Sequence, residues 1–292
     1  MVERGGDGSR EVGKLTHPLG GGAYTVGLTG APGAGKSTLT SRLIAARRAA
    51  GDEVAVLAID PTSPFTGGAI LGDRVRMQDH ALDRGVFIRS MATRGHLGGL
   101  AVATRESIRV LDAVGFPLVL LETVGVGQVE VEVAGAADTT VVVLNPGWGD
   151  GVQAAKAGLL EIADVFAINK ADRPGVNEAT RDLEHMLDLI APVDGAWRPP
   201  IVPVIAATGD GVDALWAHIE AHRAWQSGSD RLERRRRARL ADELDQLLAA
   251  RLLERARAAG DGAELERLRD EVVARRLDPW SAVDALLGSD PG

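Results

Sequence analysis

Short apolar runs rich in β-branched residues alternate along most of the chain with longer segments whose apolar residues recur at helical spacing. Seven of these runs have the length and composition of strands. They are Tyr24–Thr29, Val54–Ile59, Val86–Ile88, Leu118–Leu121, Thr139–Leu144, Val165–Asn169 and Ile201–Ile205. Strands that alternate with helices form parallel sheets covered on both faces, and such sheets bind ligands at the carboxyl ends of their strands. The sequence therefore predicts an α/β fold with a mostly parallel central sheet flanked by helices.

The pattern changes after about Trp225. One helical stripe follows, made of Leu240, Leu244, Leu247, Leu248 and Leu252, and a second is made of Leu265, Leu268 and Val272. Gly260–Gly262 separates the two stripes, and a short helix at Trp280–Leu287 ends the segment. We therefore expect a short N-terminal tail (residues 1–24), a central α/β domain (25–225) and a C-terminal helical arm (226–292). Because the leucine stripes would bury better against another chain than against solvent, the arm predicts a homodimer.

Composition narrows the class of protein. The chain has 292 residues, 45% hydrophobic and 25% charged, which suits a globular protein with a sizeable core. Its net charge of -8 argues against general binding to nucleic acid or anionic membranes. The run Arg234–Arg237 is flanked by acidic residues, which favours a solvated helix face over a site for polyanions. There is no cysteine, hence no thiolate site. Without an apolar leader segment or a membrane-spanning run, we expect a cytoplasmic location.

The strongest chemical signal follows the first predicted strand. Residues 30–37 match G-x-x-x-x-G-K-[ST] at every fixed position, between a strand and a helical stretch. In such a loop, glycines let successive N–H groups turn toward phosphates, the lysine reaches the β- and γ-phosphates, and the hydroxyl ligates magnesium. The predicted loop residues are Gly30, Ala31, Pro32, Gly33, Ala34, Gly35, Lys36, Ser37 and Thr38. The alternative, a glycine turn without a ligand, does not explain the strand and helix on either side.

Magnesium requires further oxygen ligands. Asp60 follows the second predicted strand and Glu122 follows the fourth, so both lie at strand ends. Many P-loop proteins place an aspartate where this chain has Glu122. Gly125, three residues after Glu122, is expected to turn its N–H toward the γ-phosphate. If neither carboxylate binds metal, both simply cap loops.

A base-selecting loop is predicted at the end of the sixth strand, where the sequence reads Asn169-Lys170-Ala171-Asp172. The carboxylate of Asp172 can accept two hydrogen bonds from guanine, whereas adenine lacks a matching pair of donors. GTP is therefore the expected nucleotide. After the seventh strand, the backbone N–H of Ala206 stands where many GTPases contact the base.

Several motifs together resemble the MeaB/ArgK family, the GTPases associated with methylmalonyl-CoA mutase and related cobalamin-dependent acyl-CoA mutases. The resemblance runs from about Thr25 to Trp280, and residues 122–128 (ETVGVGQ) are its most specific element. The other matching segments are Gly30–Thr38, Ile59–Ser63, Gly68–Asp73, Gly98-Gly99, Gly149-Asp150, Gln153, Lys156 and Asn169–Asp172.

The resemblance implies a GTPase that supports loading of adenosylcobalamin into the mutase, helps expel damaged cofactor and dimerises through its C-terminal helices. It implies that Asp60, Asp73 and Glu122 serve magnesium and the nucleotide switch, and that Asp73 and Lys156 assist hydrolysis. Adenosylcobalamin would reach this chain only through its partner. The sequence departs from the family in three places: a short N-terminal tail, Gly151 and Ala157.

Other functions remain open. A nickel-handling GTPase shares both nucleotide motifs but normally adds cysteine or histidine ligands; here His218 and His222 alone have the spacing of a helical metal pair, which also fits an ordinary helix face. A kinase acting on a transport protein and a nucleotide-binding scaffold without turnover are further alternatives. Because Val124 and Val126 flank Gly125 where small GTPases place a water-positioning glutamine, we expect slow intrinsic hydrolysis, with Gln128 as a candidate substitute.

Overall fold

The computed structural model divides the chain into two compact units, Met1–Arg239 and Leu240–Gly292. The boundary falls inside a long helix, further along the chain than Trp225. The structure describes residues 7–61, 77–93, 99–123, 129–147, 158, 160–189, 195–258 and 262–287.

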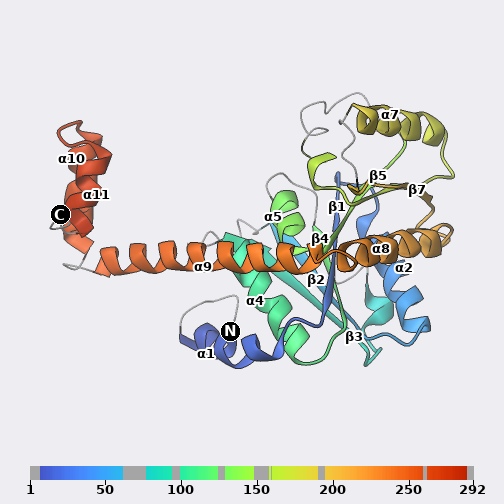
Figure 1. Cartoon of the computed structure of the whole chain (residues 1–292), viewed down its shortest axis with the longest axis horizontal. Coiled ribbons are helices and arrows are strands. Elements are labelled where there is room, and N and C mark those ends of the chain that lie inside the picture. The colour runs from blue at the N-terminus through green and yellow to red at the C-terminus, as the bar shows by residue number, and fades with distance from the viewer. Residues whose placement is uncertain are drawn as a thin grey trace. The chain divides into compact units, whose positions relative to one another are not determined.

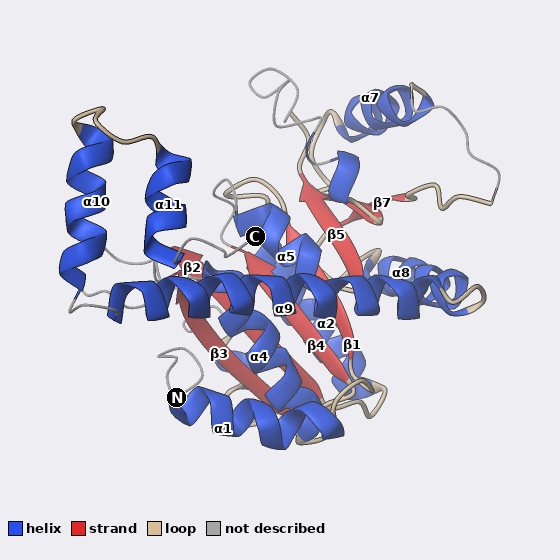
Figure 2. Cartoon of the chain, turned by 60° about the vertical axis from the view of Figure 1, so that its left-hand side comes forward, coloured by secondary structure: helices blue, strands red, loops and turns tan. Residues whose placement is uncertain are grey.

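A seven-stranded sheet forms the centre of the first unit (Figures 1 and 2). Its strands are β1 (Tyr24–Thr29), β2 (Val54–Pro61), β3 (Val86–Thr93), β4 (Leu118–Thr123), β5 (Thr139–Leu144), β6 (Val165–Asn169) and β7 (Ile201–Val204). The spatial order is β3-β2-β4-β1-β5-β6-β7, and every neighbouring pair is parallel. The predicted α/β fold is confirmed. β2, β3 and β4 extend beyond their apolar runs, whereas β7 ends one residue earlier than predicted.

Helices cover both faces of the sheet. On one face, α2 (Lys36–Ala49) and α8 (Val212–Ser227) pack on the core that includes Leu28 and Leu120. On the other face, α4 (Gly99–Ala113) and α5 (Val129–Ala136) pack on β2 and β4, while α7 (Val176–Asp188) packs on β5 and β6. Every residue of β1, β4 and β5 is buried. This double burial explains why these strands are continuous apolar runs rather than alternating ones.

The N-terminal segment differs from the expected tail. It contains a helix, α1 (Asp7–Thr16), followed by the 3-10 turn η2 (His17–Leu19). Ser9 is buried, and its Oγ donates to Glu106 Oε2 of α4 at 2.5 Å. A short helix gains most of its stability from packing, which the polar, glycine-containing sequence of this segment does not reveal.

Residues Arg234–Arg237 do not form a uniformly solvated face. Arg237 is solvated and pairs with Glu233, but Arg236 pairs with the buried Asp138 at 2.6 Å. Asp138 also pairs with Arg239 at 2.9 Å, and its side chain is 1% exposed. Because a buried carboxylate requires a counter-charge, Asp138 places Arg236 of the arginine run against the first unit rather than in solvent.

The second unit is helical, as expected. Helix α9 (Arg231–Ala258) begins in the first unit, and α10 (Ala263–Val273) and α11 (Pro279–Leu287) follow. Asp278 caps α11 by accepting from the backbone N–H groups of Trp280 and Ser281. The leucines of the α9 stripe are exposed: Leu240, Leu244, Leu247, Leu248 and Leu252.

Candidate nucleotide-binding site

The motif residues gather at one edge of the sheet. Lys36 follows β1 through the loop, Glu122 lies near the end of β4, Asn169 ends β6 and Ala206 follows β7. In register, Glu122 stands opposite Leu28 of β1. Because all strands are parallel, these residues share the carboxyl edge, where open α/β sheets bind ligands.

Glycine is required in the loop between β1 and α2. Gly30, Gly33 and Gly35 have φ values of 130°, 75° and 92°, which side chains rarely adopt. A Cβ at Gly30 would lie 2.1 Å from Val143 O, and one at Gly35 would lie 2.2 Å from Asn169 Nδ2. The loop thus fits tightly between β5 and the Asn169 loop, and larger residues are excluded by space as well as by φ.

Lys36 opens α2 and is buried, 5% exposed. Its Nζ donates to Gly30 O at 2.6 Å and to Ala31 O at 3.0 Å. The ammonium group is therefore held inside the loop, next to the start of a helix, where N–H groups and a positive charge together favour a phosphate.

Ser37 and Glu122 meet behind this loop. The Ser37 hydroxyl donates to Glu122 Oε1 at 2.5 Å, and both residues are buried. A hydroxyl and a carboxylate are hard oxygen ligands suited to magnesium, so the residues present fit the metal that the P-loop implies. Two residues selected separately from the sequence are thus in direct contact. Asp60 lies near the end of β2, but its side chain is outside the described residues.

Asn169 connects the base loop to two other segments. Its Nδ2 donates to Ala34 O at 2.8 Å, and its Oδ1 accepts from the N–H groups of Lys170 at 2.8 Å and Ala206 at 3.0 Å. The Nζ of Lys170 donates to Gly33 O at 2.6 Å. The P-loop and both predicted base-contact segments are therefore joined through one buried amide.

The remaining predicted residues differ in how they are placed. Asp172 is exposed at the carboxyl edge, and Pro32 and Thr38 are exposed on the loop and the first turn of α2. Asp73, Gly125 and Lys156 lie outside the described residues.

Arg42 also belongs to this region, although nothing in the sequence predicts its role. This residue projects from α2, and its guanidinium donates to Ala206 O at 3.0 Å and to Ala207 O at 2.5 Å. It therefore ties the helix that follows the P-loop to the segment after β7. No motif marks it, because an arginine on an exposed helix position is ordinary in sequence.

The two helical histidines do not form a metal pair. His218 is exposed, whereas His222 is buried and contacts Thr139 Oγ1 at 2.8 Å through Nδ1. Among the described residues, no group of three or more His, Asp or Glu side chains is arranged to hold a metal ion. In the same part of the chain, no helix is long and apolar enough to cross a membrane.

Residues 4–261 match the model of the family described as methylmalonyl Co-A mutase-associated GTPase MeaB. The chain belongs to the MeaB family. A GTPase relative from Pyrococcus abyssi is 49% identical over 289 residues, covering 98% of this chain and 89% of the relative. The mouse homolog of methylmalonic aciduria type A, mitochondrial, is 33% identical over 268 residues, covering 90% and 65% respectively.

The MeaB fold is also found in a crystal structure titled LAO/AO transport system kinase. The superposition covers 95% of this chain and 84% of the chain in that structure, with 27% sequence identity and a TM-score of 0.72. The motifs, their geometry and the family agree that this MeaB protein is a P-loop GTPase with a guanine nucleotide as ligand.

Proposed function

We propose that this GTPase controls the loading of adenosylcobalamin into methylmalonyl-CoA mutase, or a related cobalamin-dependent acyl-CoA mutase, and protects the loaded enzyme. The observation that carries the proposal is the match of residues 4–261 to a family named for association with that mutase. The mouse relative, whose name refers to methylmalonic aciduria, supports the same assignment. The cytoplasmic location expected from the sequence is also part of the proposal.

Lys36 and the loop N–H groups bind the phosphates in this proposal. The ammonium group, which donates to the carbonyls of Gly30 and Ala31, would exchange these partners for β- and γ-phosphate oxygens. Ser37 and Glu122 hold magnesium together with Asp60 and Asp73. Bound there, the metal supplies positive charge that the leaving diphosphate and the transferred group require. Gly125 donates to the γ-phosphate.

Asp172 selects guanine by accepting from two base donors, while Asn169 keeps the segments around the base together. The N–H of Ala206 already donates to Asn169 Oδ1. We therefore assign the contact with guanine O6 to the next N–H along the chain, that of Ala207, with Ala206 as its support.

A homodimer is part of the proposal. The exposed α9 leucines, among them Leu240, Leu244 and Leu248, supply an apolar stripe that a second copy would cover. Deleting Leu240–Gly292 should give a monomer with unchanged GDP affinity, measured by sedimentation and calorimetry. The cut follows Arg239, because Arg236 and Arg239 must remain to pair Asp138. A truncated chain that still sediments as a dimer would remove the arm from the interface.

The test of the gating role is single-turnover GTP hydrolysis with and without a cobalamin-dependent acyl-CoA mutase. We expect the mutase to accelerate hydrolysis by at least about 10-fold, as partners do for GTPases that lack a catalytic group. Lys156→Ala should still bind nucleotide but lose much of the acceleration. Equal rates with and without the mutase, once binding is demonstrated, would reject gating and leave a GTPase with another client.

One observation favours a second candidate. The solved structure titled as a transport system kinase aligns with nearly all of this chain. A kinase would transfer the γ-phosphate of labelled GTP to an acceptor protein, whereas a GTPase releases it as inorganic phosphate. Recovery of all label as inorganic phosphate, with a transport protein present as acceptor, would dismiss the kinase.

A further inference from the structure

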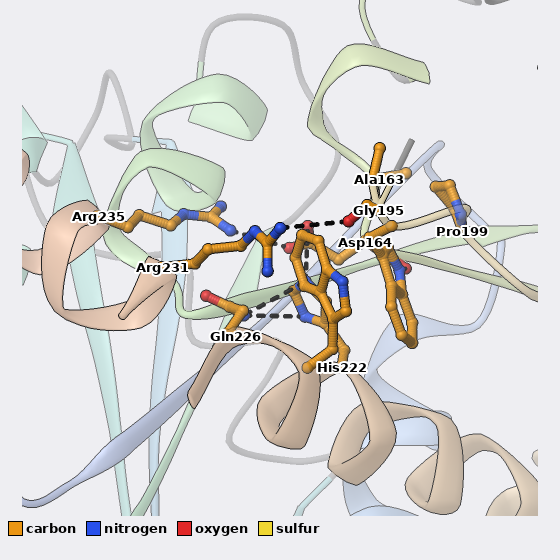
Figure 3. Close-up of a pocket in the computed structure, with 11 residues that line it drawn as sticks. Ala163, Asp164, Gly195, Pro199, His222, Gln226, Arg231 and Arg235 are labelled. Atoms are coloured by element: carbon orange, nitrogen blue, oxygen red, sulfur yellow. Dashed lines mark hydrogen bonds and ion pairs between the residues drawn. The ribbon is translucent and has the colours of Figure 1, made fainter. Parts of the chain in front are cut away.

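A cavity lies at the amino ends of β5 and β6, at the sheet edge opposite the P-loop. Asp164 directly precedes β6, and Thr139, whose Oγ1 contacts the cavity residue His222 at 2.8 Å, begins β5. Its volume is about 480 Å³, within the usual range for small-molecule sites. Figure 3 shows Arg231 and Arg235 of α9 reaching toward Asp164, with His222 and Gln226 rising from α8.

The cavity has aromatic walls. Trp197 and Trp225 are half-buried, with ring centroids 5.6 Å apart, and the buried ring of His222 lies 4.9 Å from Trp197. The indole N–H of Trp197 donates to Asp164 O at 2.7 Å, which fixes that ring. Arg231 lies over the Trp225 ring at 4.4 Å, and His222 is stacked with the same ring at 5.6 Å. A planar ring entering the cavity would therefore stack on the half-buried Trp197 and remove apolar area from water.

The charges of the cavity favour an anion. Arg231 and Arg235 contribute two positive charges against the single carboxylate of Asp164, so the ionised lining carries one excess positive charge. Burial lowers the pKa of His222 despite the neighbouring Asp164, so its ring is neutral near pH 7. The Asp164 carboxylate is already engaged by Thr140 N–H at 2.8 Å, Arg235 at 3.4 Å and His222 at 3.4 Å. A ligand cation would therefore compete for a carboxylate already in use.

The two guanidinium groups are positioned but not fully used. Arg231 stacks over Trp225 at 4.4 Å, donates through Nη1 to Ser229 Oγ, and donates to Gly195 O at a long 3.3 Å. Arg235 donates to Asp138 O at 3.3 Å. A guanidinium has five N–H donors, and the contacts with described residues leave donors available to a carboxylate or phosphate.

We propose that this cavity binds a small molecule with a planar ring and one anionic group, the ring stacked on Trp197 beside Trp225 and the anion on Arg231 and Arg235. The site is separate from the nucleotide site, because its residues lie at the other ends of the strands. Its ligand would bridge the first turns of α9 and the segment before β7, two parts of the chain that the cavity brings together.

Indole-3-acetate and AMP test the carboxylate and phosphate forms of this ligand, with GDP and magnesium saturating the P-loop. We expect at least one of the two anions to bind, as measured by calorimetry. The bound anion should shift the indole N–H resonances of Trp197 and Trp225, which are assigned with Trp→Phe variants. Indole-3-acetamide, which has the same shape without the charge, should bind at least about 10-fold more weakly.

Arg231→Gln should lower the affinity for the bound anion by about 10-fold, equivalent to roughly 1.4 kcal/mol. Arg234→Gln is the matched control: it removes the same charge from the same helix outside the cavity, and affinity should be retained. GDP affinity and basal hydrolysis should be unchanged in both variants. Absence of shifts for both anions at about 10 mM, equal binding of the amide, or equal losses in the two variants would each overturn the proposal.

Discussion

The two edges of the sheet bear different kinds of polar structure. At the carboxyl edge, contacts run mainly to backbone groups: Lys36 and Lys170 bond loop carbonyls, and Asn169 joins two loops through main-chain partners. At the amino edge, side chains bond side chains: Asp138 pairs with Arg236 and Arg239. The first arrangement leaves the groups free to exchange partners for a ligand. Around Asp138 the charges are paired internally, which favours stability, whereas Arg231 and Arg235 at the neighbouring cavity retain donors for a ligand.

Lys36→Ala should have the largest effect, a loss of hydrolysis at the carboxyl edge with little loss of stability. Hydrolysis should fall by at least about 10²-fold and triphosphate affinity should weaken, because the variant removes the cation held inside the phosphate loop. The unfolding midpoint should change little. Single-turnover hydrolysis and urea unfolding measure the two effects, with the exposed Lys14→Ala as control. Wild-type hydrolysis in the Lys36 variant would refute the P-loop assignment.

Asp138→Asn is expected to lower stability while leaving nucleotide binding unchanged, the reverse of the Lys36 variant. It leaves Arg236 and Arg239 without a buried counter-charge, so the free energy of unfolding should fall by about 3–5 kcal/mol while GDP affinity in the folded state stays the same. Glu233→Gln, in an exposed pair with Arg237, should barely move the midpoint in urea. Equal stability of the two variants would show that the buried pair contributes nothing special.

Asp172→Asn should reduce GTP affinity by about 10²-fold and improve binding of xanthosine triphosphate, since an amide can donate to the 2-oxo group of xanthine. Calorimetry with both nucleotides measures the exchange. Asp182→Asn, an exposed change on α7, should leave the order of affinities unaltered. If GTP binds the Asp172 variant as tightly as wild type, another group reads the base.

Arg42→Ala should weaken GTP binding by about 2–10-fold, because it releases Ala206 O and Ala207 O from α2 and loosens the segment that contacts the base. The turnover rate at saturation and the affinity for inorganic triphosphate, which lacks a base, should be retained. Arg42→Lys should recover part of the loss. A parallel loss of inorganic triphosphate binding would indicate a general disturbance of the P-loop instead.

The smallest effect concerns pH at the amino edge. Burial lowers the pKa of His222 in the folded state below the ordinary histidine value of about 6.5. When the pH falls below about 6.5, the unfolded chain therefore binds more protons than the folded chain. The stability due to the neutral ring is fully present above that pH and is lost as the pH falls below it. Urea titrations at several pH values should show this slope flattened in His222→Gln but unchanged in the exposed His218→Gln. Identical slopes in all three proteins would contradict the assignment.

Local sequence sufficed where function depends on backbone geometry. Residues 30, 33 and 35 favour glycine because of their positive φ values, and at 30 and 35 the nearness of Val143 and Asn169 also leaves no room for a Cβ. The same holds for strands buried on both faces, since their continuous apolar runs identify them directly. Helix α1 escaped prediction because its stability depends on α4.

The sequence by itself determined the parallel α/β fold, the phosphate loop and the family, and it predicts the guanine loop. Tertiary structure alone decided which arginines of the 234–237 run turn inward, that Arg42 supports the segment after β7, and that two tryptophans and two arginines surround one cavity. The physical reason is distance along the chain. A motif encodes contacts among neighbours, whereas Asp138 meets Arg236 only after the sheet has formed, and either residue alone has the sequence context of an ordinary surface charge.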